Sequence, residues 1–433
     1  MTLLKRLLSR GPLAHESTAL VLNTAISGLG RALGIAVTLV STALITRSLG
    51  VEHFGAYSFI LAFVSTFSVL ADFGLGQLLT REISRSLPDA AGGSEATTAK
   101  AYVVGDIFIL RLALLIVFLS AAPIAALFFP YPVPIVKGII LGSVSFLFLS
   151  LAQLFIGVFQ RELAMHWVVS AELAGRVAQL GAVLGAYLAG ARETVLFLEI
   201  FAGGAILQFL ILLIGARRFV PMRLRLDTRR WWALAREAFP IGASLVFTYI
   251  YFRTDAIILS YYHPGEPVGY YNLAYRVLEH TIFFPAMFVG LVFPRLAALW
   301  PMDAVAFRGV FARTFKTILF GAPLTTAGLA LFAPFIMRVL GGPGFEPAAA
   351  ALRILSVAVF VIYLATLPGS TVVAMGIQKR AVWLYLSGAL INVGLNFLFI
   401  PRYSFIAASW TTVVTEVIVT AGLYWLVWRE MRR

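Results

Sequence analysis

Hydrophobic residues fill twelve long stretches of this chain, and the short segments between them hold most of its charged residues. A helix needs about 20 apolar residues to cross a bilayer, and each stretch reaches that length. Because backbone amides cannot bond to lipid, such a stretch has to be helical inside a membrane. The pattern therefore predicts an all-α integral membrane protein with twelve transmembrane helices. The expected spans are 18–46, 54–79, 102–128, 135–159, 167–189, 194–215, 239–262, 269–293, 314–338, 348–371, 381–400 and 404–428, with breaks at glycine and proline residues such as Gly50, Pro88 and Pro401.

The composition agrees with lipid as the main solvent. The chain of 433 residues is 60% hydrophobic and 12% charged, with a mean hydropathy of +0.91. The net charge of +14 would suit a nucleic-acid partner, but the loops are too short for a nucleic-acid-binding module, and we expect none. Cysteine is absent, which excludes disulfides and thiolate metal sites.

The basic residues indicate how the chain is oriented. With the predicted spans, 23 of the 34 Lys and Arg residues flank one side of the membrane and 5 flank the other. Basic residues are retained on the cytoplasmic side of membrane helices. The count therefore predicts an inner-membrane protein with both termini in the cytoplasm.

A basic segment divides the spans into two groups of six. It contains seven arginines and the pair Trp231-Trp232, a composition typical of a helix at the headgroup boundary. Such a segment either binds anionic lipid or only links the two halves. We expect a cytoplasmic amphipathic N-terminus at 1–17, an N-lobe at 18–215, the interfacial linker at 216–238, a C-lobe at 239–428 and a cytoplasmic tail at 429–433.

The two halves also resemble each other in sequence. Because each half has an even number of spans, both start on the same side, so a pseudo-two-fold axis along the membrane normal would relate two six-helix lobes. Transporters built in this way bind substrate between the halves. The residues that match at an offset of 214 are Gly55 and Gly269, Tyr57 and Tyr271, and Arg81 and Arg295.

Three segments of the chain resemble a known family. They are LGVEHFGAYSFILAFVSTFSVLADFGLGQLLTREISR (49–85), RTDAIILSYYHPGEPVGYYNLAYRV (253–277) and INVGLNFLFIPRYSFIAASWTTVVTE (391–416). They are similar to the bacterial polysaccharide transport family of Wzx-type flippases, within the multidrug, oligosaccharidyl-lipid and polysaccharide exporter superfamily. The resemblance implies two lobes and a flippase for O-antigen or exopolysaccharide repeat units in lipopolysaccharide and related polysaccharide biosynthesis.

The same resemblance implies the substrate and partners. The substrate would be an undecaprenyl-pyrophosphate-linked oligosaccharide that crosses from the cytoplasmic to the periplasmic leaflet by alternating access. Membrane lipids, a polysaccharide polymerase and chain-length proteins would be partners. No cofactor or metal is expected. Coupling to an H⁺ or Na⁺ gradient stays open, because each acid inside the spans also has a structural interpretation. Two alternatives stay open: a cation or multidrug exporter of the same fold, and a membrane glycan polymerase or transferase.

An enzyme is the weaker of these alternatives. The sequence contains no HExxH, GxSxG or P-loop motif. A polymerase would need a large periplasmic loop, and no predicted loop on that side exceeds about a dozen residues. We therefore predict a transporter without catalytic residues.

Ionisable residues inside the spans are the candidate binding site. Each costs about 2.5–3.5 kcal/mol at a helix centre, so it should face a partner or water. Arginine suits pyrophosphate because its planar fork makes paired hydrogen bonds and stays charged. The candidates for the central cavity are Arg31, Asp72, Arg253, Asp255, Arg276 and Glu279, and those for headgroup entry at the cytoplasmic helix ends are Arg81 and Arg295.

Several of these residues have a structural interpretation as well. Arg276 and Glu279 lie on one helix face and either pair with each other or face the cavity. Arg253 and Asp255 point to nearly opposite faces, so one should meet a neighbouring helix. Asp72 either couples a cation or proton or bonds to another helix. Arg176 should pair with Glu172 along its helix, and Asn392 and Asn396 should hold helices together. Asp106 and Arg111 should have a structural role, since they lie near a cytoplasmic helix end from which long side chains can extend to the interface.

Overall fold

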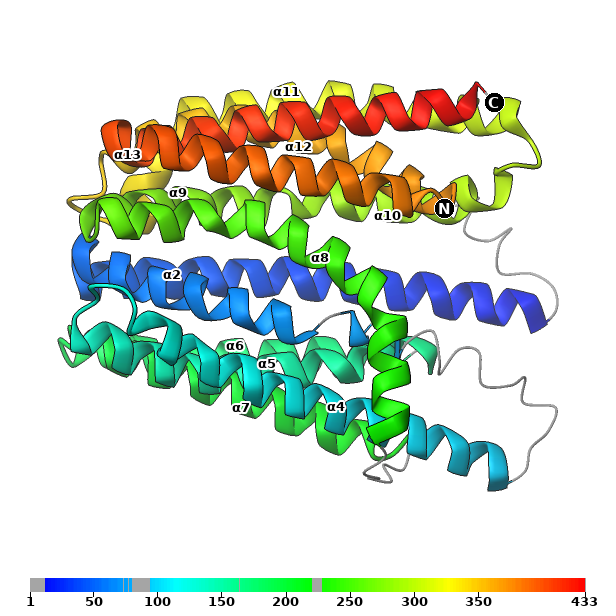
Figure 1. The fold of residues 1–433 in the computed structure, drawn as a ribbon, viewed down its shortest axis with the longest axis horizontal. Coiled ribbons are helices and arrows are strands. Elements are labelled where there is room, and N and C mark those ends of the chain that lie inside the picture. Colours follow the sequence, from blue (N-terminus) through cyan, green and yellow to red (C-terminus); the bar gives the residue numbers. More distant parts are fainter. Residues whose placement is uncertain are drawn as a thin grey trace. The chain divides into compact units, whose positions relative to one another are not determined.

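The structure, a computed structural model, describes residues 12–72, 74–76, 78–79, 94–162, 164–219 and 228–432. The elements in these ranges are helices (Figure 1). They are α2 (Pro12–Asp72), α4 (Ser94–Ala126), α5 (Val133–Arg161), α6 (Met165–Leu188), α7 (Thr194–Ala216), α8 (Thr228–Tyr262), α9 (Glu266–Thr281), α10 (Phe283–Leu299), α11 (Ala304–Gly341), α12 (Ala348–Ala374) and α13 (Gln378–Met431).

Nine helical segments of the described residues are long and apolar enough to cross a membrane. This supports a multi-pass membrane protein. Two segments contain a break at which the chain turns back: α2 at Gly50 (φ 69°, ψ −177°) and α13 at Ser404 (φ 52°, ψ −139°) (Figure 1). A total of twelve transmembrane helices stays a prediction.

The breaks agree only in part with those expected from the sequence. The break at Gly50 is confirmed, and its positive φ is one that glycine adopts without steric cost. The break expected at Pro401, between the spans 381–400 and 404–428, is present but lies three residues later, at Ser404, because Pro401 itself is within the helix. The expected eighth span is two helices, α9 and α10, which meet at Ile282. Pro88 lies outside the described residues.

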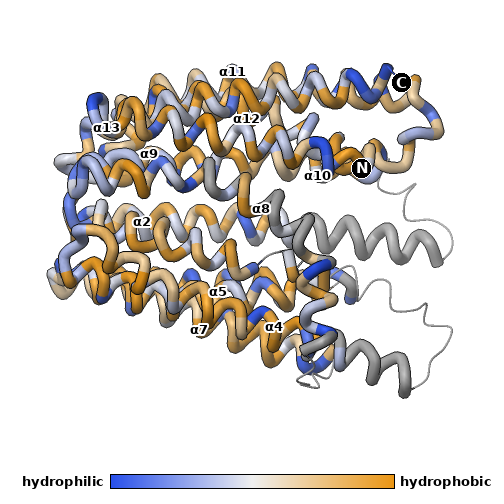
Figure 2. Tube along the Cα trace, viewed as in Figure 1, coloured by the Kyte–Doolittle hydropathy of each residue, from blue (hydrophilic) through white to orange (hydrophobic). Residues whose placement is uncertain are grey.

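Large apolar side chains point outward along the helices. Phe128 is 84% exposed, Phe320 83% and Leu331 75%. Water would make such a surface unfavourable, whereas lipid tails solvate it, so these faces are suited to contact lipid. Figure 2 shows hydrophobic residues along the lengths of the helices and hydrophilic ones mainly near their ends.

The chain forms two compact units. Unit 1 contains residues 1–41, 67–190 and 195–242, and unit 2 contains 42–66, 191–194 and 243–433. Helix α12 is central to unit 2, because α9, α10, α11 and α13 all pack against it. The boundaries of the predicted lobes stay a prediction.

The core of unit 1 joins α4 and α5 to the beginning of α8. Ile107 of α4 and Leu154 of α5 are fully buried there, and Leu234 and Ala238 of α8 complete the cluster. Trp231, which precedes them, packs against its edge. The described part of the predicted linker is therefore the first turns of α8, which anchor that helix to unit 1.

Elsewhere in unit 1, α6 and α7 cross at two glycines. A Cβ at Gly175 would lie 2.7 Å from the carbonyl oxygen of Gly204, and a Cβ at Gly204 would lie 3.0 Å from that of Gly175. The backbones can approach this closely only because neither residue has a side chain, as in other close crossings of membrane helices.

We expect Gly175→Leu to lower the thermal unfolding midpoint of the purified protein, because the crossing of α6 and α7 would have to open. Overpacking of this kind costs about 1–3 kcal/mol. Gly181→Leu on the same helix is the matched control, since nothing lies within 4 Å of a Cβ built there. Equal midpoints for the two variants would show that the crossing does not stabilise unit 1.

Candidate functional site

A buried carboxylate lies among hydroxyl and amide groups inside unit 2. Asp255 of α8 is 0% exposed. Its Oδ2 accepts hydrogen bonds from Tyr271 Oη at 2.6 Å and Thr412 Oγ1 at 2.8 Å, and its Oδ1 accepts one from Asn396 Nδ2 at 3.0 Å. One carboxylate therefore joins α8 to α9 and to both arms of α13. From the sequence, either Arg253 or Asp255 was expected to meet a neighbouring helix, and Asp255 does.

The two asparagines extend this cluster. Asn396 Nδ2 also donates to Asn392 Oδ1 at 2.9 Å, and Asn392 Nδ2 donates to Thr415 Oγ1 at 3.4 Å. Thr411 Oγ1 donates a short hydrogen bond to Asn396 Oδ1. Both asparagines are 0% exposed. Their predicted role in holding helices together is confirmed, since they join the two arms of α13 across the turn at Ser404.

Asp255 is the one carboxylate among these hydrogen-bonded groups. The described residues contain no group of three or more His, Asp or Glu that could hold a metal ion. Asp255 faces the hydroxyls of Tyr271 and Thr412 and the amide nitrogen of Asn396, so the cluster has a single formal negative charge. Such a cluster suits a proton or a monovalent cation better than a divalent one.

Arg253 and Glu279 form an ion pair in unit 2. The Arg253 Nη2 and Glu279 Oε1 atoms are 2.5 Å apart, and each side chain is about one quarter to one third exposed, at 25% and 31%. The guanidinium also lies 5.9 Å from the ring centroids of Tyr249 and Tyr275. The sequence interpretation in which Glu279 pairs with Arg276 is therefore wrong, because the partner comes from α8.

Arg276 contacts neutral groups. Its Nη1 donates to Thr42 Oγ1 at 3.0 Å, and its guanidinium carbon lies 5.9 Å from the Phe54 ring and 6.0 Å from the Tyr57 ring. These partners belong to α2, in the part that folds within unit 2. Arg276 is half-buried. A cation held at the faces of two aromatic rings is stabilised there without losing its charge.

Unit 1 presents two arginines on or beside α2. Arg31 is exposed. Arg176 of α6 is half-buried and donates from Nη1 to Thr38 Oγ1 at 2.9 Å. Because Thr38 lies seven residues after Arg31, both occupy the same face of α2. Sequence reasoning assigned Arg176 to a pair with Glu172 and missed this proximity, which depends on how α6 packs.

Asp72 and Arg111 are partners in unit 1. Arg111 Nη1 lies 2.8 Å from Asp72 Oδ1, and its Nη2 donates to Ser150 Oγ at 3.0 Å. Arg111 is 1% exposed and Asp106 is 0% exposed, so neither extends to the interface, while the structural role expected of both is confirmed by their ion pairs. Asp106 Oδ2 lies 3.1 Å from Arg230 Nε, an ion pair with the first turn of α8. Helix contacts compensate these charges instead of water.

The candidate entry residues fall at one described and one undescribed position. Arg295 is exposed near the end of α10. Arg81 lies outside the described residues. The structure therefore brings Arg253, Asp255, Arg276 and Glu279 together on α8 and α9 of unit 2, and places Arg31 and Asp72 in unit 1.

At one end of unit 2, the two repeated motifs pack against each other. A Cβ at Gly55 would overlap the Gly265 carbonyl oxygen, and a Cβ at Gly269 would lie 2.5 Å from the Val51 carbonyl oxygen. Val51 and Gly265 differ by 214, the same offset that relates Gly55 to Gly269. The contact is thus reciprocal, as expected at a local two-fold axis.

Hydrogen bonds from α2 close this end further. Thr46 Oγ1 donates to the Leu340 carbonyl oxygen at 2.5 Å, and Arg47 Nη2 donates to the Val339 carbonyl oxygen at 2.8 Å. Phe54 lies edge-on to Phe345, with ring centroids 5.7 Å apart. The turn of α2 at Gly50 is therefore held by the end of α11 and the segment that follows it.

Comparison with known proteins supplies the family and the fold. A family model described as "Polysaccharide biosynthesis protein" matches residues 20–300. No curated protein sequence matches the chain.

Solved structures share the fold at low sequence identity. An inward-facing multidrug resistance MATE family transporter of the MOP superfamily matches with a TM-score of 0.77 and 14% identity, over 92% of this chain and 94% of the other. The lipid II flippase MurJ matches with 0.73 and 16%, over 94% and 87%. A MOP superfamily transporter from Pyrococcus furiosus matches with 0.62 and 14%, over 99% and 97%. At this identity the matches show that the chain shares its fold with two transporters and a flippase.

We expect Gly269→Leu to open the end of unit 2 at which the repeated motifs meet. This opening can be measured by disulfide cross-linking between two introduced cysteines, Arg47→Cys and Gly342→Cys, since the chain has no other cysteine. The two positions are close, because a Cβ at Gly342 would lie 3.2 Å from Arg47 Cγ. Disulfide formation requires such proximity, so Gly269→Leu should reduce oxidative cross-linking several-fold. Gly328→Leu, at a position with nothing within 4 Å, should leave it unchanged. Equal cross-linking in all backgrounds would contradict the closure.

Proposed function

The chain belongs to the polysaccharide biosynthesis protein family, and from this premise we propose that it is a flippase for lipid-linked oligosaccharides. Its substrate would be a polyprenyl-pyrophosphate-linked repeat unit, moved from the cytoplasmic to the periplasmic leaflet by alternating access. The lipid tail stays in the bilayer while the charged head crosses.

Arg276 is the observation that carries this proposal. Its neighbour Glu279 pairs with Arg253, so these two charges compensate each other, while the contacts of Arg276 are a hydroxyl and two aromatic rings. A guanidinium at the centre of a membrane helix costs about 2.5–3.5 kcal/mol. A pyrophosphate would offset that cost through charge-assisted paired hydrogen bonds.

Arg31 supports the same chemistry in unit 1. Arg31 is exposed. The side chain of Arg176, from α6, contacts the same face of α2 through its hydrogen bond to Thr38. Two guanidiniums on one helix face attract an anion more strongly than one does. Within unit 2 we assign Arg276 to the pyrophosphate, and Arg253 and Glu279 to the sugar or to switching between states, because their ion pair is partly exposed and can exchange partners. Within unit 1 we assign Arg31 to an anion.

Asp255 is the residue that we propose to couple transport to an H⁺ or Na⁺ gradient. Burying a charged carboxylate without compensation costs free energy. Because Asp255 bonds to α9 and α13, binding of a proton or a cation to it would change how α8, α9 and α13 pack. Three hydrogen-bond donors converge on it, and two of them are hydroxyls that can rotate to offer lone pairs to a cation.

The remaining assignments follow from the family and from charge. We propose a bacterial inner-membrane location with both termini in the cytoplasm, twelve transmembrane helices in two lobes, and a role in O-antigen or exopolysaccharide assembly beside a polymerase and chain-length proteins. The basic residues retained on one side support the orientation.

We expect purified protein in proteoliposomes to accelerate leaflet exchange of a fluorescent polyprenyl-pyrophosphate glycan over protein-free vesicles. Arg276→Ala should slow this exchange at least tenfold, because a hydrogen bond to a charged group contributes about 1.5–3 kcal/mol. Arg313→Ala, an exposed arginine of α11, should not. No acceleration by the wild type would contradict the flippase, whereas normal exchange by an Arg31→Ala, Arg276→Ala double variant would contradict only the site.

Asp255→Asn should uncouple exchange from an imposed gradient, because the amide carries no charge to be compensated by a proton or cation. We expect downhill exchange to persist while accumulation driven by an H⁺ or Na⁺ gradient is lost. The measurement is glycan accumulation with and without an ionophore. If the variant remains folded by its unfolding midpoint and still responds to the gradient, Asp255 is not the coupling residue.

A further inference from the structure

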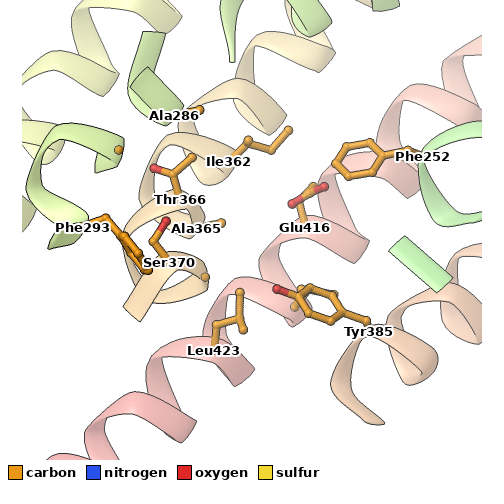
Figure 3. A pocket seen from close by; sticks show the side chains of 13 residues that line it. Phe252, Ala286, Phe293, Ile362, Ala365, Thr366, Ser370, Tyr385, Glu416 and Leu423 are labelled. Carbon is orange, nitrogen blue, oxygen red and sulfur yellow. The ribbon is translucent and has the colours of Figure 1, made fainter. Parts of the chain in front are cut away.

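Unit 2 contains a cavity that none of the candidate site residues lines. It has a volume of about 390 Å³ and lies among α8, α10, α12 and α13 (Figure 3). Small-molecule sites in proteins have volumes of about 300–1,000 Å³, so this cavity can hold a small organic molecule.

A single carboxylate supplies the charge of the cavity. Glu416 of α13 lines it and is 2% exposed. Figure 3 shows its side chain across the cavity from Thr366 and Ser370 of α12, with Tyr385 of the other arm of α13 on the same side as Glu416. Hydroxyl groups from two helices thus line the cavity together with the carboxylate.

The rest of the wall is apolar. Phe252 and Phe293 lie on different sides of the cavity, and alanine, glycine and aliphatic side chains complete it (Figure 3). A Cβ added at Gly290 would meet nothing within 4 Å, and one added at Gly369 would meet Tyr385 Oη only at 3.9 Å. Glycines at these positions keep the space open without being needed for helix packing.

The charge of the lining selects the ligand. The thirteen lining residues, all in the part of the chain that the structure describes, include one acid and no lysine, arginine or histidine. An anion would be repelled by Glu416, and a free sugar would find too few hydrogen-bonding groups among the apolar walls. An ammonium group, by contrast, would gain a carboxylate and aromatic faces, while an apolar body filled the remaining space.

We propose that this cavity binds an amphiphilic organic monocation, with its ammonium group at Glu416 and its apolar part between Phe252 and Phe293. This goes beyond the proposed function, whose substrate is an anion. The lining residues do not include Arg276, so binding of the ligand does not depend on the arginine assigned to the pyrophosphate.

A pair of isosteric probes tests the role of charge. Full-length protein in nanodiscs of zwitterionic lipid is titrated with phenylbutyltrimethylammonium and with its neutral analogue, in which carbon replaces the nitrogen. We expect saturable binding of the cation and at least tenfold weaker binding of the neutral analogue. Equal affinities would show an apolar pocket without charge selection, and no saturable binding of the cation would also overturn the proposal.

Two variants locate the site. Glu416→Gln keeps the shape and should weaken binding of the cation at least tenfold, while Glu346→Gln, an exposed glutamate of the same unit, should not. Gly290→Leu fills the cavity and should abolish binding with little change in the unfolding midpoint, because its side chain enters open space. Undiminished binding by a folded Gly290→Leu protein would place the cation elsewhere.

The same variants separate this proposal from the flippase. Arg276→Ala should leave binding of the cation unchanged, whereas it slows glycan exchange. If Arg276→Ala and Glu416→Gln weaken cation binding equally, the cation does not occupy a separate cavity and the proposal fails.

Discussion

Charged and polar side chains between these helices need hydrogen-bond or ion-pair partners from the protein itself. This requirement determines how the helices pack. The outward faces are apolar enough for lipid, so every buried charge has to be compensated by another helix. Asp72 therefore meets Arg111 of α4, Asp106 meets Arg230 of α8, and Glu279 meets Arg253. Each pair connects two different helices, and losing one partner would leave the other charge without compensation.

The second determinant of packing is the absence of side chains where backbones cross. Apolar surface gives little preference for one helix neighbour over another in lipid, because lipid tails are as apolar as leucine. Close crossings at glycine restore that preference. Gly175 meets Gly204 in unit 1, and Gly55 and Gly269 each fit beneath a backbone carbonyl of the other motif in unit 2. The latter contact is built from two copies of one sequence motif, so the internal repeat has a direct structural role.

Unit 2 combines three kinds of chemistry in one bundle. Arg276 presents a cation among aromatic rings, Asp255 is enclosed by hydrogen-bond donors, and Glu416 faces an apolar cavity. The differences arise from the surroundings: three hydrogen-bond donors converge on Asp255, whereas Glu416 lines a cavity. Unit 1 has cationic groups of its own, at Arg31 and Arg176.

The sequence by itself determined the solvent, the helical class, the family and which residue types had to find partners. These follow from local properties: the length of apolar stretches, the distribution of lysine and arginine, and the spacing of motifs such as GVEHFGAY. It also located the break at Gly50, because a positive φ is a property of one residue. Only the tertiary structure decided the partners. Glu279 was one turn from Arg276 yet pairs with Arg253, and Arg111 near a predicted helix end is buried, because side-chain pairing depends on which helices pack side by side. The cavity at Glu416 was invisible for the same reason: its walls come from four helices whose residues span 252 to 423, and no local pattern records that they meet.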